Sequence, residues 1–112
     1  MDRPQSLNVP PFFDGNNYAF WKVRMRAFLC SIDDTVWDAV ETGWTRPEAA
    51  KSTWDKVALA AANVNSKALN AIFCGVSPNE FHKILHITVA KEAWEILETT
   101  YEGMKKVKDT KL

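Results

Sequence analysis

Apolar residues between positions 18 and 32 recur in steps of three and four, with lysine and arginine in the gaps between them. They are Tyr18, Trp21, Met25, Phe28 and Ile32. This spacing places them on one side of an α-helix, because residues three or four apart lie about one turn apart. The pattern predicts a helix over 17–31, with Asn16 or Asn17 as its N-cap.

Two further helix starts follow. The run Asp33-Asp34-Thr35 supplies capping side chains for a short helix over 36–40 that ends near Gly43. The run Thr45-Arg46-Pro47-Glu48 matches a capping box with proline in the first turn, and predicts a long helix that ends at Gly75. Polar residues over 63–66 compete for backbone hydrogen bonds and are a candidate break in that helix. The predicted apolar face consists of Trp54, Val57, Ala61, Val64, Ala68, Leu69, Ile72 and Phe73.

The last third of the chain carries two more starts. Ser77-Pro78-Asn79-Glu80 is a second capping box and predicts a short helix that reaches Leu85. Thr88 is the expected cap of the next helix, and Gly103 is expected at the C′ position just beyond its end. The apolar stripe of that helix is Ala90, Trp94, Leu97 and Tyr101. Because alternating polar and apolar runs are absent, the sequence predicts an all-α fold, a compact bundle of about five helices.

Proline punctuates the N-terminal end. Pro4, Pro10 and Pro11 cannot continue a helix and favour extended backbone before them. We therefore expect an extended, proline-rich arm over 1–16, a helical domain over 17–103, and the basic start of a following helix over 104–112.

Composition narrows the class of protein. The 112 residues are 46% hydrophobic, which is too apolar for a disordered chain. The net charge of zero argues against a dedicated duplex-DNA binder. Signal-peptide and membrane-span patterns are absent. Cys30 and Cys74 are isolated in the sequence, and we expect them to be buried thiols of a cytoplasmic, reducing environment.

The sequence offers little chemistry. His82 and His86 have a spacing that can hold zinc on a helix, but a third and fourth ligand are missing. Asp33 and Asp34 are better explained as helix caps than as an acid–base pair. Glycine-rich phosphate loops and nucleophile elbows are absent. We therefore expect no catalytic residue, no metal and no cofactor.

Aromatic and basic residues are the candidate contact residues. Trp21, Trp54 and Trp94 lie on apolar stripes, and we expect them in the core. Residues outside those stripes are candidates for an interface, with burial in the core as the alternative: Phe12, Phe13, Trp37 and Trp44. Four lysines near the C-terminus can contact RNA or form a solvated face: Lys105, Lys106, Lys108 and Lys111.

Two blocks of sequence resemble a known family. The segment Phe13-Asp14-Gly15-Asn16-Asn17-Tyr18-Ala19-Phe20-Trp21, with Met25 and Leu29 after it, is similar to the opening of the Gag polypeptide of plant Copia-type LTR retrotransposons. The segment 90–98, followed by Tyr101-Glu102-Gly103, is similar to a later block of the same Gag. The signature residues that we expect in the core are Phe13, Gly15, Tyr18, Trp21, Met25, Leu29, Trp94, Leu97 and Tyr101.

The resemblance implies a function as well as a fold. Gag of this family forms the shell of a cytoplasmic virus-like particle around RNA, and its capsid region is helical and related to retroviral capsid. The resemblance therefore implies a retroviral-capsid-like N-terminal lobe, taken from a longer Gag or kept as a short host copy. The family's zinc knuckle for RNA is absent from these residues. We expect a non-enzymatic structural domain that binds further copies of itself, with no membrane and no small-molecule substrate. The alternative is a domesticated module that binds a host protein or peptide, and a minor alternative is weak RNA binding through the lysines.

Overall fold

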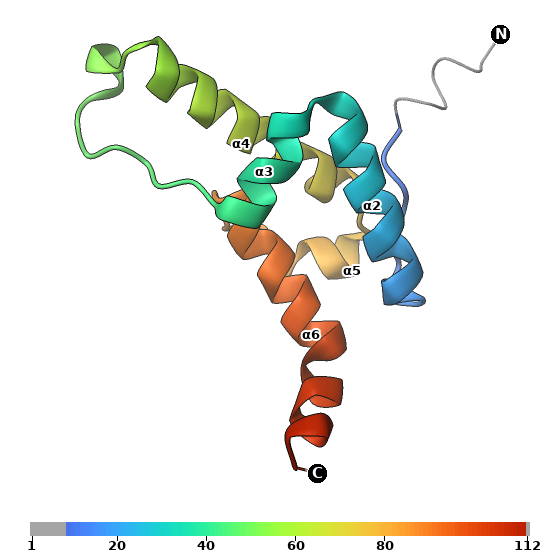
Figure 1. Cartoon of the computed structure of the whole chain (residues 1–112). Coiled ribbons are helices and arrows are strands. Elements are labelled where there is room, and N and C mark those ends of the chain that lie inside the picture. The colour runs from blue at the N-terminus through green and yellow to red at the C-terminus, as the bar shows by residue number, and fades with distance from the viewer. Residues whose placement is uncertain (1–8, 112) are drawn as a thin grey trace, which may run out of the picture.

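The computed structural model describes the backbone of residues 9–111 and the side chains of residues 9–103. The elements are α2 (Tyr18–Ile32), α3 (Asp34–Thr42), the 3₁₀ helix η1 (Lys51–Thr53), α4 (Lys56–Cys74), α5 (Pro78–Phe81) and α6 (Ala90–Lys111). Five α-helices and no strand occur in the described range, which confirms the all-α class (Figure 1). Helices α2, α3, α4 and α6 pack around one core.

Helices α2 and α3 are joined through a single residue. Asp33 ends α2, because its N–H bonds the carbonyl of Leu29, and it begins α3, because its carboxylate accepts a hydrogen bond from the Thr35 N–H at 2.8 Å. This hydrogen bond and a second one from the Thr35 hydroxyl lower the pKa of Asp33. The predicted caps and the predicted end near Gly43 agree with the structure, within a residue or two.

The start predicted for α4 is wrong. The capping box at 45–48 lies in a loop, and α4 begins at Lys56 with Asp55 as its cap. The Asp55 carboxylate accepts a hydrogen bond from the Ala58 N–H at 2.8 Å. The loop has local support, since the Trp54 indole donates to the Ala49 carbonyl at 2.9 Å and lies under the Arg46 guanidinium. These contacts hold the chain in a conformation that a helix over the same residues would not allow.

Helix α4 is not broken over 63–66, because Asn65 uses its side chain elsewhere. Asn65 is buried, and its amide donates to the Thr88 carbonyl at 2.8 Å and accepts from the Ala90 N–H at 2.8 Å. Ala90 is the first residue of α6. The cap of α6 thus comes from α4 and not from the Thr88 side chain, which corrects the sequence prediction.

Helix α6 also ends later than predicted. It passes through Gly103 and reaches Lys111, so residues 104–111 belong to α6 and not to a further helix. Gly103 has ordinary helical surroundings, and an added Cβ there would meet only Thr99 at 3.6 Å. Nothing at Gly103 forces the left-handed turn that ends a helix.

The N-terminal arm lies on the helices of its own chain. Phe13 forms a parallel bridge with Val76, donating to the Gly75 carbonyl at 2.8 Å and accepting from the Ser77 N–H at 2.9 Å. The Trp21 indole donates to the Pro11 carbonyl at 3.0 Å. Part of the predicted arm, including Pro4, lies outside the described residues.

Two helix ends project from the packed centre. The radius of gyration is 15.5 Å, against about 13 Å for a compact domain of this length. Figure 1 shows the beginning of α4 and the end of α6 running outward in different directions. Val57 is 76% exposed and Ala61 is also exposed, so the first half of the predicted apolar face of α4 does not face the core.

Candidate interaction surfaces

Aromatic residues from the segments 13–21 and 94–101 meet in one cluster. The ring of Phe13 lies 5.6 Å from Tyr18, 5.0 Å from Trp21 and 5.0 Å from Tyr101, centroid to centroid. Trp21 in turn stacks on Trp94 at 5.7 Å. Rings at these distances attract one another beyond the effect of buried area. The cluster joins the arm, α2 and α6, which are far apart in the sequence.

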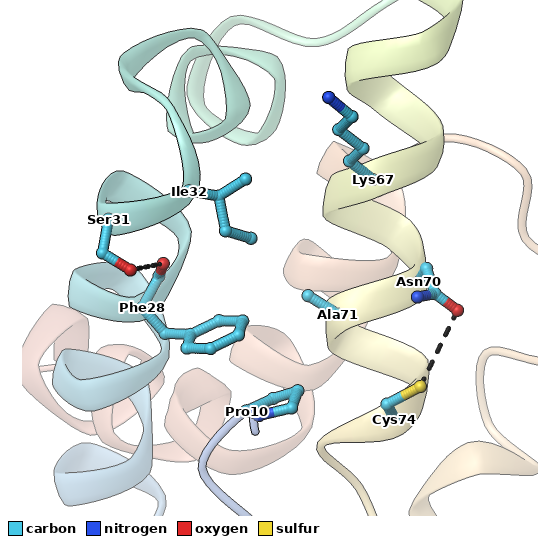
Figure 2. A pocket seen from close by; sticks show the side chains of 8 residues that line it. All are labelled: Pro10, Phe28, Ser31, Ile32, Lys67, Asn70, Ala71 and Cys74. Atoms are coloured by element: carbon cyan, nitrogen blue, oxygen red, sulfur yellow. Dashed lines mark hydrogen bonds between the residues drawn. The ribbon is translucent and has the colours of Figure 1, made fainter. Parts of the chain in front are cut away.

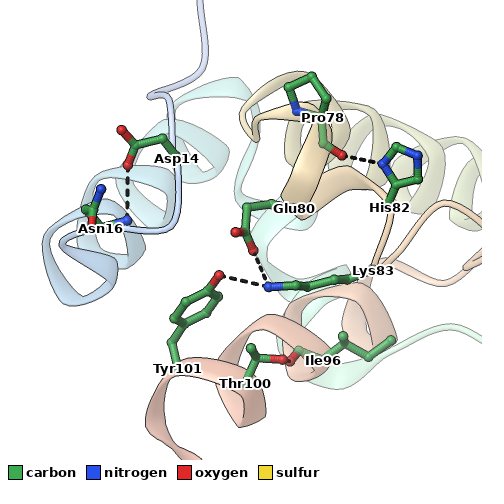
Figure 3. Close-up of polar contacts among 9 residues, drawn as sticks. All are labelled: Asp14, Asn16, Pro78, Glu80, His82, Lys83, Ile96, Thr100 and Tyr101. Carbon is green, nitrogen blue, oxygen red and sulfur yellow. Dashed lines mark hydrogen bonds and ion pairs between the residues drawn. The ribbon is translucent and has the colours of Figure 1, made fainter.

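Gly15 serves the turn that brings Phe13 into this cluster. Its φ of 103° favours glycine, and an added Cβ would lie 3.1 Å from a carboxylate oxygen of Glu80. Figure 3 shows Glu80 and Tyr101 converging on the ammonium of Lys83, at 3.0 Å in each case. Two hydrogen bonds raise the pKa of Lys83. The bond with Tyr101 has the larger effect and the bond with Glu80 the smaller. The backbone therefore favours glycine here, and the buried carboxylate beside it leaves little room for a side chain.

A second ion pair ties α2 to α6. The Lys22 ammonium lies 2.9 Å from Glu98 and 3.2 Å from Glu102. Burial alone would lower the pKa of Lys22, but the hydrogen bonds with both carboxylates outweigh it and raise the pKa. Tyr18 lies beside this group, and burial, reinforced by the charges of Glu102 and Glu98, strongly raises its pKa. These ion pairs connect α2 to α6, so their role is structural.

The four predicted interface residues have different surroundings. Phe13 is 1% exposed at the centre of the aromatic cluster, which confirms its predicted place in the core and makes the interface prediction wrong for it. Trp37 is half-buried, because its ring packs edge-on against Trp94 and lies under Arg26. Phe12 is 64% exposed. Trp44 is half-buried in the wall of a groove.

That groove lies between α3 and α4 and has a volume of about 560 Å³. Its apolar lining is mostly small: Ala39, Ala60, Ala61 and Val64, with Trp44 beside them. Asp33 and Asp38 add carboxylates to the lining. This α3–α4 groove combines an apolar floor with acidic side chains.

A second groove separates α2 from α4 and has a volume of about 540 Å³ (Figure 2). Phe28 and Ile32 line it from α2, and Lys67, Asn70 and Cys74 line it from α4. Cys74 is exposed and donates weakly to Asn70 at 3.7 Å. Cys30 is exposed too, so the prediction of buried thiols is wrong. The reason is the helix register, since each cysteine follows a buried residue, Leu29 or Ile72, by one or two positions and so points elsewhere.

The two most exposed of the large apolar side chains on α2 lie opposite its buried stripe. Phe20 is 65% exposed and Val23 is 68% exposed, while Ala27 and Cys30 continue the same line and are also exposed. These four residues are separated by three, four and three positions, and we call them the outer face of α2. The guanidinium of Arg24 lies 5.3 Å from the centre of the Phe20 ring. Sequence reasoning missed this face, although its spacing is as regular as that of the buried stripe.

Other chemistry is sparse in the described residues. No group of three or more His, Cys, Asp or Glu side chains among them is placed to hold a metal ion. His82 contacts the Pro78 carbonyl through Nδ1 at 2.7 Å (Figure 3). Within the described chain, every helix is too short or too polar to cross a membrane. The predicted RNA contacts, namely Lys105, Lys106, Lys108 and Lys111, have side chains outside the described part.

Comparison of the chain with protein-family models, with curated proteins and with solved structures finds no match in any of the three.

Proposed function

We propose that the chain is a structural, non-enzymatic domain of the Copia-type Gag class, whose function is to associate with further copies of itself in a particle shell. The observation that carries this proposal is the outer face of α2. An apolar line on the solvent side of a helix adds nothing to the core of its own chain, and such surfaces usually serve contacts with other molecules. Phe20 and Val23 supply its two large side chains.

The resemblance to Gag supports the same proposal from the packing. Phe13, Tyr18, Trp21, Trp94 and Tyr101 come from the two Gag-like blocks and form one cluster. The two segments therefore have a physical reason to occur together, because the rings of one pack against the rings of the other. A stable core of this kind is suited to a domain whose function depends on surface contacts with other molecules.

Sedimentation velocity over a concentration series tests the proposal. We expect wild-type protein to shift to larger species as concentration rises, and the double variant Phe20→Ser, Val23→Ser to stay monomeric. Val9→Ser is a matched control for Val23→Ser, because Val9 is 62% exposed, against 68% for Val23, but lies on the N-terminal arm. A wild-type chain that remains monomeric at every concentration would contradict the proposal.

The second candidate function is a module that binds a peptide or host protein, and the α3–α4 groove favours it. Grooves with an apolar floor and a few polar groups accept helical or extended segments. Trp44 is the aromatic side chain in the groove wall. A monomeric chain that retains a defined partner in a pull-down, and loses it on Trp44→Ala with unchanged circular dichroism, would favour this function over self-association.

RNA binding through the C-terminal lysines is the minor alternative. The chain has no net charge, so we expect only weak RNA affinity, and one that falls steeply between about 50 and 200 mM salt. Fluorescence anisotropy with a labelled single-stranded RNA measures this dependence. A complex that is insensitive to salt and selective for sequence would favour RNA binding as a main function.

A further inference from the structure

We propose that the outer face of α2 in one copy docks into the α3–α4 groove of a second copy. The inference rests on the proposed self-association and states which two surfaces meet. Both surfaces are left open by the packing of a single chain. They differ in shape, because the first is a convex helix face and the second is a concavity of about 560 Å³.

The two surfaces match in size. Phe20 is the largest side chain of the outer face and is 65% exposed. The groove lining includes Ala60, Ala61 and Ala39, whose small side chains leave space that a ring can fill. Trp44 in the wall offers an aromatic surface to that ring.

The two surfaces also match in charge. Helix α2 contains no aspartate or glutamate, and Arg24 lies over the Phe20 ring, so the cation accompanies the ring into a contact. Helix α3 contains no lysine or arginine, and Asp38 lines the groove. Pairing α2 with α2 of a second copy would instead bring arginine toward arginine, and like charges at an interface oppose association. The acidic groove is therefore a better partner for the outer face of α2 than α2 of a second copy.

The contact must form between molecules. The opposite side of α2 is fixed in the core by Trp21, Met25 and Leu29, so the outer face of α2 cannot turn toward the groove of its own chain. Each copy then offers one face and one groove, which is a head-to-tail arrangement. Such contacts continue from copy to copy and close into rings or extend as open arrays. A contact that propagates in this way is compatible with a shell of many copies.

Two variants block one surface each, and their mixture tests the proposal. Phe20→Ser removes the ring but leaves the groove intact, whereas Ala61→Trp fills the groove but leaves α2 intact. We expect each variant alone to self-associate at least about tenfold more weakly than wild type, since a buried aromatic anchor carries that much affinity. Mixed in equal amounts, they should form 1:1 dimers that grow no further, because only one intact contact is available. Leu59→Ser is the control, as Leu59 is 42% exposed but belongs neither to the outer face of α2 nor to the lining of the α3–α4 groove.

Analytical ultracentrifugation of the mixture separates the outcomes, with circular dichroism to verify folding. If wild type assembles while the mixture remains monomeric, or if either variant alone assembles like wild type, the docking proposal is wrong although self-association stands. A wild-type chain that is monomeric throughout would overturn both. If Ala61→Trp does not fold, Asp38→Arg blocks the groove in its place. In that case Arg24→Glu combined with Asp38→Arg in one chain should restore assembly that each change alone weakens, and failure of the restoration would overturn the docking proposal.

Discussion

The two faces of α2 have almost the same spacing of apolar residues, but one face is buried and the other is exposed. The inner face, with Trp21, Met25 and Leu29, is buried in the core. The outer face, with Phe20 and Val23, repeats steps of three and four on the other side and is exposed. Apolar periodicity therefore shows that a helix face can be buried, but it does not show what buries it. The inner face is buried by residues of its own chain, and the outer face remains available for contact with another molecule.

The largest expected effect is on the inner face. Trp21→Ala should lower the free energy of unfolding by about 3–5 kcal/mol, because it removes a buried ring from contact with Phe13 and Trp94. Urea denaturation followed by circular dichroism measures this change. A variant that unfolds at the same urea concentration as wild type would mean that the aromatic cluster does not stabilise the fold.

A smaller effect is expected in the turn that delivers Phe13 to the inner face. Gly15→Ala should cost about 1–3 kcal/mol, since a side chain at φ 103° is strained and its Cβ would lie 3.1 Å from Glu80. Thermal unfolding measures the loss. Gly103→Ala is the control, because that helical position has room for a Cβ, and it should raise stability slightly. Equal melting temperatures for the two variants would contradict the assignment of strain to Gly15.

Lys22 lies at the edge between the two faces. Its ion pairs should contribute at most about 1 kcal/mol to the free energy of unfolding, as partly exposed ion pairs do. Its pKa is raised in the folded state, so this contribution is complete below the unfolded pKa near 10.5 and is lost as the pH rises through the higher folded value. We therefore expect Lys22→Met and wild type to differ at pH 8 and to converge in strongly alkaline solution. A difference that persists there would mean that packing of the lysine stem, and not its charge, is responsible.

The smallest effect on stability is expected on the outer face. Phe20→Ser should change the free energy of unfolding by no more than about 0.5 kcal/mol, because its ring is exposed in the monomer. Denaturation at a concentration where the chain is monomeric is the relevant measurement. A large loss of stability would show that Phe20 belongs to the core after all, and the comparison between the two faces would collapse.

Local signals in the sequence predicted the local parts of the fold. The bounds of α2, the cap at Asp33 and the end of α4 at Gly75 depend on residues within a few positions of one another, and each lies where the pattern placed it within a residue or two. The predicted stripe of α2 is correct up to Met25, but Leu29 is buried and Ile32 is 41% exposed.

The start of α4 was mispredicted because two cap signals compete, and Trp54 with its neighbours stabilises the loop between them. The cap of α6 comes from Asn65, which is distant in sequence, so local patterns cannot reveal it.

The candidate surfaces were less predictable than the helices. Burial of Phe13 is accompanied by a bridge to Val76, which is distant in the sequence. The α3–α4 groove likewise exists only where α3 and Trp44 approach the middle of α4. The outer face of α2 was different, because its spacing is visible in the sequence. The spacing alone does not show which of two apolar stripes on one helix faces the core.

The cap that Asn65 provides for α6 also bears on the order in which the protein folds. The first turn of a helix is the costly step in its formation, and here the groups that complete it belong to α4. The beginning of α6 should therefore remain frayed until α4 has docked, and the two helices should gain protection together. In native-state hydrogen exchange, the amide of Ala90 should become exchangeable in the same opening event as the amides around Asn65, so that α4 and the start of α6 behave as one cooperative unit.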